Sequence, residues 1–254
     1  MASLRDLLTA TKAQIREVTT AEADDLRVAP GAITLDVREA DEYEQGALPK
    51  ALHIPRGTLE TSIEMKVPAK DTPLVVYCAG GTRSAFAAKS LEELEIMRRA
   101  GRITGEAHLA AMRAAEPGRF EYELEAEINR IFRMRGAERP AYETIVGSGP
   151  NATILHHRRN DRRMEDGDLV LIDAGCELEY YASDVTRTFP VNGKFSPAQR
   201  AVYETVLRAQ EAAIAATRPG VTLDDVHRAA VEVLVDGLLE MGLLEGGRAE
   251  ILEK

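Results

Sequence analysis

Two apolar stretches, Asp168-Leu-Val-Leu-Ile-Asp-Ala-Gly175 and Tyr180-Tyr-Ala-Ser-Asp-Val-Thr-Arg-Thr-Phe189, set the architecture of the larger part of this chain. Branched apolar and aromatic residues are frequent in both, which indicates strands. Asp173 and Asp184 are eleven positions apart, so a hairpin would bring them together. A carboxylate in an apolar strand is costly unless it is paired or binds a metal. Two converging carboxylates suit divalent ions, but the spacing leaves hydrogen-bonded turn aspartates as an equal alternative.

Helix signals surround these strands. Residues 121–135 have a helical apolar pattern. Ser196-Pro-Ala-Gln199 is a capping box with proline at the first helical position, which predicts a helix to about Thr217. Thr222-Leu-Asp-Asp225 predicts another helix start, with the helix extending to about Leu244. Strands are expected at residues 141–147, 168–174 and 178–190. The pattern therefore predicts an α+β domain.

Strands and helices alternate in the first part of the chain. Residues 33–37 and 74–77 predict strands, and residues 40–45 and 83–94 predict helices. This alternation is typical of an α/β module with a parallel sheet. No proline or loop signal occurs from residue 83 to 116. Either a helix ends near residue 94 without a stop signal, or two helices are joined end to end.

Composition excludes several classes of protein. The chain has 254 residues and a net charge of −10, which argues against a general nucleic-acid binder. No window approaches the roughly 18 consecutive apolar residues of a membrane span. The N-terminal residues lack the features of a secretory signal, and two cysteines are too few for a disulfide framework. We therefore expect a cytoplasmic protein with no membrane or nucleic-acid partner.

A cysteine stands where the second strand of the α/β module ends, in Val75-Val-Tyr-Cys78-Ala-Gly-Gly-Thr-Arg-Ser84. Backbone N–H groups of a glycine-containing loop and the N-terminus of a helix lower a thiol pKa and hold an anion against the sulfur. Arg83 and Ser84 are placed to complete this anion-binding loop, which we call the Cys78 cradle. Four residues separate Cys78 from Arg83, and this small loop suits a terminal sulfur better than a phosphate. The alternative is a buried, inert cysteine.

The sequence around this loop resembles the rhodanese family over about residues 15–94. The motifs that carry the resemblance are Leu35-Asp-Val-Arg-Glu39, Glu42-Tyr43, Gly46-Ala-Leu-Pro49, Ala51-Leu-His-Ile-Pro55, the Cys78 loop and Ala87-Ala-Lys-Ser-Leu91. The resemblance implies a thiosulfate sulfurtransferase-type activity in which Cys78 carries a persulfide and Arg83 and Ser84 act as loop residues. A sulfur donor and a sulfur acceptor are then the partners.

The chain departs from the rhodanese pattern in several places. Ala47 stands where the family usually has histidine, and Lys50 where it usually has glycine. The family continues past the loop helix with another strand and a tryptophan-bearing helix, whereas this sequence changes at Glu95 and contains no tryptophan. We expect residues 1–94 to form a rhodanese-like domain that lacks its last strand and helix. Such a sheet exposes an edge, which favours a homo-oligomer.

Residues 95–254 resemble the catalytic domain of aminopeptidase P, one of the pita-bread metallopeptidases. The motifs are Ile96-Met-Arg-Arg-Ala-Gly-Arg-Ile-Thr104, Gly147-Ser-Gly-Pro-Asn-Ala-Thr-Ile-Leu-His156, Asn160, Gly167-Asp168, Asp173-Ala-Gly175 and Ser183-Asp-Val-Thr-Arg-Thr-Phe-Pro190. By this resemblance the cofactor is a pair of divalent ions, usually manganese. Asp173 and Asp184 are metal ligands, with Asp184 bridging the two ions. His156 contacts a proline-containing peptide and stabilises the tetrahedral intermediate.

The same resemblance implies that the ligand set is incomplete. The family holds its ions with two aspartates, one histidine and two glutamates, and the stretch that carries the histidine lies beyond the last helix of this sequence. After Asp184 the only histidine is His227, in an amphipathic helix pattern, and Glu250 and Glu253 have no ligand context. We expect weak metal binding. The arginines at residues 158–159 and 162–163 are expected to lie in a solvated turn.

The sequence thus predicts an α/β rhodanese-like module followed, at residues 95–254, by the N-terminal part of a pita-bread α+β domain. Three functions stay open. The first is a sulfur-transfer module fused to an Xaa-Pro aminopeptidase domain that has lost its hydrolase activity. The second is an active metalloaminopeptidase that a partner chain completes. The third is a non-catalytic recombined or truncated chain.

Overall fold

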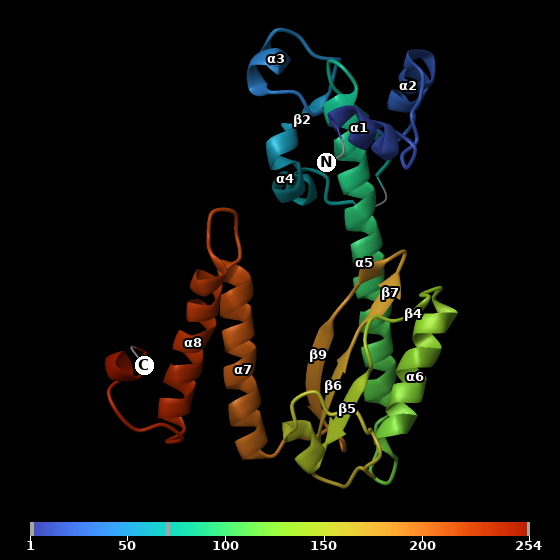
Figure 1. Cartoon of the computed structure of the whole chain (residues 1–254). Helices are drawn as coiled ribbons and strands as arrows, with labels where there is room; N and C mark the ends of the chain where they lie inside the picture. The colour runs from blue at the N-terminus through green and yellow to red at the C-terminus, as the bar shows by residue number, and fades with distance from the viewer. Residues whose placement is uncertain (1–2, 70–71, 253–254) are drawn as a thin grey trace. The chain divides into compact units, whose positions relative to one another are not determined.

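The computed structural model describes residues 3–69 and 72–252, and the chain divides into two compact units, Met1–Arg99 and Ala100–Lys254. Both units combine helices and strands (Figure 1). The boundary between them falls inside one helix, α5, which runs from Thr82 to Ala114 without a break. Of the two alternatives at the junction, the structure has the joined helix. Its two glycines, Gly101 and Gly105, each cost roughly 1 kcal/mol relative to alanine, which is not enough to end a helix of 33 residues.

The first unit contains a three-stranded parallel sheet. Its elements are α1 (Leu4–Lys12), α2 (Thr20–Arg27), β1 (Ile33–Asp36), α3 (Ala40–Glu44), β2 (Leu52–His53), the 3-10 turn η1 (Arg56–Thr58), α4 (Leu59–Lys66), β3 (Leu74–Tyr77) and the start of α5. The strand order is β2-β1-β3. Leu35 on β1 pairs with Leu52 and Val76, and it is completely buried in a cluster with Val37, Ile54 and Leu59. The alternating sequence pattern predicted this parallel arrangement.

Strand β3 lies at one edge of this sheet and leads directly into the Cys78 loop. All four of its residues are only half-buried, whereas three of the four residues of the central strand β1 are buried. Within residues 3–69 and 72–252, no strand pairs with the outer edge of β3. An edge strand presents unpaired N–H and C=O groups, so β3 can accept a further strand.

The second unit is built around an antiparallel sheet. Its elements after α5 are α6 (Glu121–Met134), β4 (Arg139–Pro140), β5 (Ile145–Ser148), the 3-10 turn η2 (Gly149–Thr153), β6 (Leu169–Ala174), β7 (Cys176–Leu178), β8 (Tyr181–Ala182), β9 (Val185–Pro190), α7 (Pro197–Ala216), α8 (Leu223–Glu240) and α9 (Arg248–Leu252). The larger sheet has the order β5-β6-β9, and a smaller one has the order β4-β7-β8. Strand β6 alternates half-buried and buried residues, as expected for a central strand.

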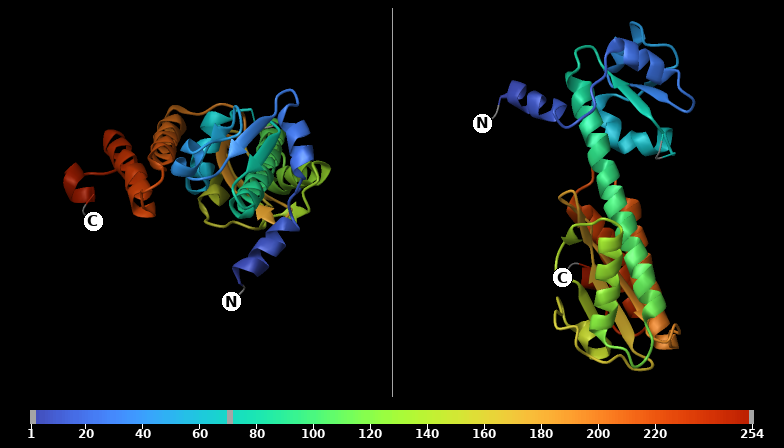
Figure 2. Two further views of the ribbon diagram at one scale, coloured as in Figure 1. Left: turned by 90° about the horizontal axis from the view of Figure 1, so that it is seen from above. Right: turned by 90° about the vertical axis from the view of Figure 1, so that its right-hand side faces the viewer.

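Helix α6 and the second half of α5 lie side by side against these strands (Figure 2). Arg135 and Glu106 form an ion pair at 2.6 Å between the two helices. The hydroxyl groups of Thr104 on α5 and Ser183 are 2.7 Å apart, and the Cys176 N–H donates to both. Leu124, Ile128 and Phe132 of α6 are completely buried, so this helix supplies much of the core.

Helices α7 and α8 form an antiparallel hairpin (Figure 1). Each begins at a capping box, Ser196 with Gln199 and Thr222 with Asp225, as the sequence predicted. Helix α8 ends at Glu240, four residues before the predicted end. Within the described ranges, no helix combines the length and apolar character that crossing a membrane requires.

Candidate functional site

The Cys78 loop directs several donors at one sulfur atom. Strand β3 delivers Cys78 to the loop, and α5 begins four residues later. The Gly81 and Ser84 N–H groups donate to Cys78 Sγ at 3.1 and 3.4 Å, and the Cys78 thiol donates to the Ser84 hydroxyl oxygen at 3.5 Å. Gly81 has φ = +80°, a left-handed conformation that glycine adopts without strain. The loop can therefore hold a negative charge on sulfur.

These contacts decide the ionisation of Cys78. Burial raises the pKa of the thiol because it disfavours the charged thiolate. Hydrogen bonds from the Ser84 side chain and from the N–H groups of Ser84, Gly80 and Gly81 outweigh this effect, so the pKa lies below its ordinary value. Cys78 is a half-buried free cysteine. A partly accessible thiol with a lowered pKa is the environment of a reactive cysteine.

Arg83 pairs with carboxylates beside this loop. Its guanidinium binds both carboxylate oxygens of Glu42, at 2.5 and 2.8 Å, and lies 3.9 Å from Glu39. The Arg83 pair and an N–H bond from Glu39 lower the pKa of Glu42 to about 2. Ser84 thus contacts the sulfur directly, whereas Arg83 forms an ion pair beside it. Glu42 belongs to one of the rhodanese-like motifs, but nothing in the sequence pointed to its pairing with Arg83.

The second candidate site is formed by two carboxylates at the ends of neighbouring strands. Asp173 lies on β6, where it pairs with Thr186 of β9, and Asp184 immediately precedes β9. Gly175 permits this turn, because a Cβ atom there would lie 1.6 Å from the Ser183 carbonyl oxygen. The Tyr142 hydroxyl lies 2.6 Å from Asp173 Oδ1 and 2.8 Å from Asp184 Oδ1. The hairpin therefore brings the two aspartates together.

A single hydroxyl proton cannot satisfy two carboxylates. Burial, and then the hydrogen bonds to Asp173 and Asp184, raise the pKa of Tyr142 far above its ordinary value, so this hydroxyl stays protonated and donates to one oxygen at a time. A divalent cation would neutralise both carboxylates at once, and oxygen ligands suit such ions. The two aspartates therefore fit part of a metal site. Among the described residues, neither belongs to a cluster of three potential metal ligands.

His156 lies in the same hollow as the two aspartates. This open pocket, of about 310 Å³, is lined by Tyr142, Glu143, Ile145, His156, Arg158, Asp173 and Asp184. His156 is exposed and has φ = +54°, a conformation that is uncommon for a residue with a side chain. The structure thus places three residues singled out by the sequence, His156, Asp173 and Asp184, around one pocket. It also adds Tyr142, which the sequence analysis missed because a lone tyrosine carries no spacing signal.

A third cluster combines Glu121, His157 and Asp161, whose potential ligand atoms lie within 4.8 Å of one another. Glu121 is completely buried. Its oxygens already accept hydrogen bonds from the N–H and hydroxyl of Ser148, the Asn151 amide and the Arg162 N–H. A metal ion would have to displace these donors. Glu121 therefore acts as a structural carboxylate that joins α6 to two loops.

The expectation of a solvated turn at residues 158–163 is wrong for Arg162. Its side chain forms a short ion pair with Asp168 and donates to the Ser148 hydroxyl at 3.0 Å. Only 22% of this side chain is exposed, against 68% for Arg158. Well-aligned hydrogen bonds to protein groups can replace the water that an exposed arginine side chain would bind. The sequence spacing alone could not show which arginine finds such partners.

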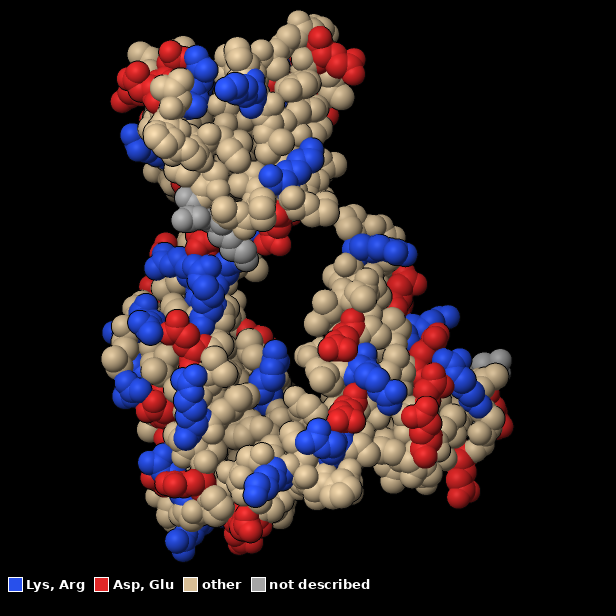
Figure 3. Space-filling model, turned by 180° about the vertical axis from the view of Figure 1, so that it is seen from behind, with Lys and Arg blue, Asp and Glu red and all other residues tan. Residues whose placement is uncertain are grey.

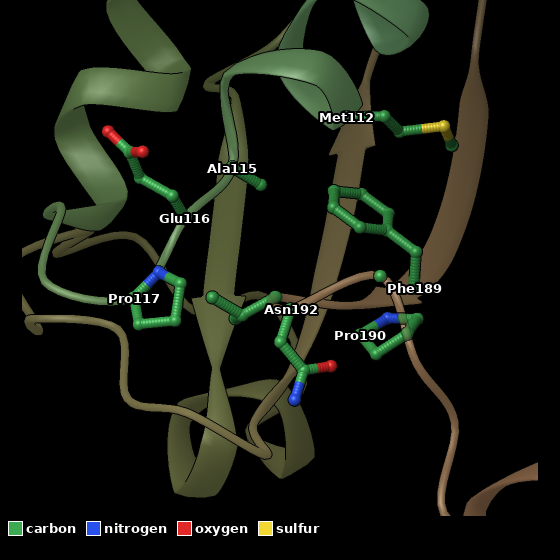
Figure 4. A pocket seen from close by; sticks show the side chains of 9 residues that line it. Met112, Ala115, Glu116, Pro117, Phe189, Pro190 and Asn192 are labelled. Carbon is green, nitrogen blue, oxygen red and sulfur yellow. The ribbon is translucent and has the colours of Figure 1, made fainter.

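A larger hollow, of about 570 Å³, lies where α5 and β9 end (Figure 4). Met112, Pro117, Phe189 and Pro190 line it, and Glu116 is its one titratable residue. It therefore lacks a group of acids, bases or nucleophiles. On the face of the molecule shown in Figure 3, acidic and basic side chains are interspersed, with no broad basic area of the kind that binds nucleic acid.

Comparison with known proteins identifies a family for each part of the chain. Residues 19–108 match the rhodanese-like domain, and residues 95–248 match metallopeptidase family M24. The two matches share residues 95–108, which lie in the joined helix α5. The predicted order of the two families is thus confirmed, and so is the predicted fold class of a rhodanese-like module with a partial pita-bread domain.

Two of the curated relatives are bacterial Xaa-Pro aminopeptidases. That of Escherichia coli (strain K12) is 51% identical over 164 residues, which cover 65% of this chain and 37% of the relative. That of Haemophilus influenzae is 47% identical over 166 residues, which cover 65% of this chain and 39% of the relative. The chain therefore spans less than two fifths of the length of these relatives.

Solved structures give the same picture. A variant of Escherichia coli aminopeptidase P has a TM-score of 0.63 and 50% identity, covering 64% of this chain and 37% of the solved one. Aminopeptidase PepP of Pseudomonas aeruginosa also has a TM-score of 0.63, with 34% identity, covering 87% of this chain and 60% of the solved one. The M24 match extends over more than half of the residues. This chain belongs to metallopeptidase family M24 and carries a rhodanese-like domain ahead of its M24 region.

Proposed function

We propose that this chain is a sulfurtransferase that acts through Cys78, fused to an M24 region that does not hydrolyse peptides by itself. One observation carries the proposal: the Gly81 N–H, the Ser84 N–H and the Ser84 hydroxyl all lie within 3.5 Å of Cys78 Sγ. The two N–H groups donate to the sulfur, and the Ser84 hydroxyl, which accepts from the neutral thiol, can donate to the thiolate. All three groups favour the thiolate, which is the nucleophilic form of cysteine. They would also hold the negative charge of a persulfide on the same sulfur.

The proposed reaction has two displacement steps. The Cys78 thiolate attacks the outer sulfur of thiosulfate, a new S–S bond forms, and the S–S bond of thiosulfate breaks. Its electron pair leaves with sulfite, so Cys78 becomes a persulfide without any added oxidant. A nucleophilic acceptor then attacks the terminal sulfur, and Cys78 leaves as a thiolate. Ser84 and Gly81 stabilise the sulfur anion at the start and at the end of this cycle.

The M24 region brings together few of the residues that metal-dependent peptide hydrolysis requires. Asp173 and Asp184 would hold divalent ions, and manganese is the metal we propose. Such an ion supplies a polarised water and a positive charge near the scissile carbonyl. His156 lines the same pocket and would contact a peptide with proline in its second position. We infer weak metal binding by these residues, because the two carboxylates brought together here are a small ligand set.

The domain limits are part of the proposal. We propose that residues 1–94 form the rhodanese-like domain without the family's last strand and helix, and that residues 95–254 form the N-terminal part of the M24 domain. The outer edge of β3 supports the first statement, since no described strand pairs with it. That edge is also where a second copy of the chain would pair, which gives a homo-oligomer. Both cysteines are free thiols, which suits a reducing compartment such as the cytoplasm.

Thiosulfate loading tests the sulfurtransferase proposal. The purified chain is incubated with thiosulfate under anaerobic conditions, and the peptide that contains Cys78 is analysed by mass spectrometry. We expect one added sulfur atom on Cys78, none in the Cys78→Ser variant, and normal loading in the matched Cys176→Ser variant. Folded protein without added sulfur on Cys78 would overturn the proposal.

A peptidase assay tests the other half. We expect no detectable release of the first residue from an Xaa-Pro peptide, with or without manganese. Robust turnover would refute the proposed loss of activity. Turnover that appears only after addition of a chain carrying the remaining M24 residues would support completion by a partner. A chain inactive in both assays would be the non-catalytic alternative.

A further inference from the structure

A lysine from outside the rhodanese-like match reaches the Cys78 loop. Helix α1 ends at Lys12, and the match to the rhodanese-like domain begins at residue 19. The Lys12 ammonium nitrogen lies 4.0 Å from the position that a Cβ atom would take on Gly81. Gly81 is the residue whose N–H donates to Cys78 Sγ. A positive charge therefore stands beside the loop that holds the reactive sulfur.

Helix α1 has local features that set the position of Lys12. Its first turn is held by a capping box in which Ser3 and Asp6 bond reciprocally to backbone N–H groups. Thr11, one residue before Lys12, is buried, while most of the helix is exposed. The helix therefore packs through its C-terminal end. This is the end that carries Lys12 to Gly81.

Arg83 and Lys12 both lie near the Cys78 loop, but they differ in how readily they could bind an added anion. Arg83 binds Glu42 through two parallel hydrogen bonds and has Glu39 as a second carboxylate nearby. Such a two-point pair fixes the guanidinium and neutralises its charge. Among the residues that the structure describes, Lys12 forms one ion pair, to Glu17 at 2.6 Å, and the Glu17 side chain is 53% exposed. An exposed single-point pair is weak, so an anion in solution can replace Glu17.

We propose that Lys12 is a specificity-determining residue that selects anionic sulfur donors for Cys78. The ligand class is a small oxoanion, such as the sulfonate end of thiosulfate, that exchanges with Glu17 at the Lys12 ammonium while its outer sulfur faces Cys78. The inference rests on the proposed sulfurtransferase function. Lysine suits this exchange because its ammonium is a flexible point charge with three donors.

The surrounding charges explain why one lysine should matter. Glu39 and Glu42 more than balance Arg83, and the whole chain has a net charge of −10. Without Lys12, a doubly negative donor would meet carboxylates on its approach to Cys78. Electrostatic attraction between exposed groups is screened beyond about 10 Å at 0.1 M salt. The contribution of Lys12 should therefore weaken as ionic strength rises.

A pair of alkylating probes isolates this charge effect. Iodoacetate and iodoacetamide carry out the same substitution on a thiolate, but only iodoacetate is anionic. In the full chain, we expect Lys12→Ala to slow iodoacetate alkylation and thiosulfate loading of Cys78 about fivefold at low salt. Iodoacetamide should react at the wild-type rate. Each rate is measured at Cys78 by peptide mass spectrometry, so Cys176 does not contribute.

Three further variants complete the test. Lys12→Arg should retain most of the preference for the anionic probe, and Glu17→Gln should increase it, because the competing carboxylate is gone. Lys89→Ala is the matched control, since it removes one half-buried positive charge of α5 that lies seven residues, or about 10 Å, from the start of the helix. It should change neither rate.

Equal effects of Lys12→Ala on both alkylating probes, or no effect on either, would overturn the role of Lys12. Wild-type protein that shows the Lys12-dependent preference for iodoacetate but takes no sulfur from thiosulfate would overturn the sulfurtransferase function alone. Thiosulfate loading of Cys78 in Lys12→Ala at the wild-type rate would overturn the inference alone. The two failures are therefore distinguishable.

Discussion

The two candidate sites differ in how much chain is needed to build them. The Cys78 cradle is made by seven consecutive residues, from Cys78 to Ser84, at the junction of one strand and one helix. The carboxylate pair needs Tyr142, Asp173 and Asp184, which come from three separate segments. A local site can be complete within a small fold, whereas a site assembled from distant segments depends on every segment that supplies a ligand.

A mutation in the core of the M24 region should destabilise that region without affecting the Cys78 cradle. Glu121→Ala removes a completely buried carboxylate and leaves the N–H groups of Ser148 and Arg162 without a partner. We expect the free energy of unfolding of the M24 region to fall by about 3 kcal/mol. Urea unfolding followed by circular dichroism measures this loss.

The control for this variant is Glu127→Ala on the same helix, which removes a more exposed ion pair with Arg130 and should cost less than about 1 kcal/mol. Sulfur loading of Cys78 should be unchanged in both variants. If Glu121→Ala also abolished loading, the contrast between a local and a dispersed site would fail, because the cradle would then depend on the distant core.

A smaller effect is expected inside the cradle. Ser84→Ala removes the hydroxyl 3.5 Å from Cys78 Sγ, so the pKa of Cys78 should rise. At neutral pH a smaller fraction of the thiol is ionised, and we expect thiosulfate loading to slow about fivefold. The pH midpoint of loading should move upward, and the rates of variant and wild type should converge in alkaline solution.

Ser90→Ala is the matched control, because the Ser90 hydroxyl lies on the same helix but accepts a hydrogen bond from Arg56. It should leave the pH midpoint in place. A Ser84→Ala variant that is slower at every pH by the same factor would show that Ser84 positions the donor and does not tune the thiol.

A still smaller change is expected at the carboxylate pair. In Tyr142→Phe, Asp173 and Asp184 lose the one hydroxyl that lies between them, so their mutual repulsion favours a cation. We expect manganese to bind about threefold more tightly than in the wild type, measured by calorimetry and by the manganese-dependent rise in melting temperature. Asp173→Asn should remove this response.

Tyr180→Phe is the corresponding control, since its side chain is 93% exposed at the tip of the β7–β8 hairpin. Its manganese affinity should equal that of the wild type. Weaker binding in Tyr142→Phe would mean that the hydroxyl positions the aspartates for metal and does not compete with it.

The sequence could predict those features that rest on local signals. The strand periodicity at residues 168–174, the capping boxes at Ser196 and Thr222 and the glycine-containing Cys78 loop each depend on neighbouring residues, and the structure contains all of them. The convergence of Asp173 and Asp184 followed from hairpin spacing. The joined helix α5 could not be decided, because nothing in the sequence distinguishes a missing stop signal from a continuous helix.

Contacts between residues far apart in the chain could not be predicted from the sequence. Glu121 looks like an ordinary first-turn helix residue, yet it is completely buried because Ser148 of β5, Asn151 of η2 and Arg162 converge on it. Tyr142 and Lys12 also reach their sites through tertiary packing. Periodicity can indicate that a residue faces inward, but it cannot name the donor that a distant loop brings to meet it.

The smallest expected effect concerns Glu42, which lies beside the cradle but does not contact the sulfur. Its pairing with Arg83 lowers its pKa from an ordinary value near 4.5 to about 2. A carboxyl whose pKa is lowered by folding adds stability above the ordinary pKa and loses that contribution as the pH falls towards the lowered value. The melting temperatures of wild type and Glu42→Gln should therefore differ slightly at pH 6 and approach each other between about pH 4.5 and 2. Thiosulfate loading of Glu42→Gln at neutral pH should stay within about twofold of wild type, because the donors to Cys78 Sγ remain in place. A larger loss would mean that Arg83, once released from Glu42, alters the approach of the donor, and the cradle would then extend beyond its seven residues.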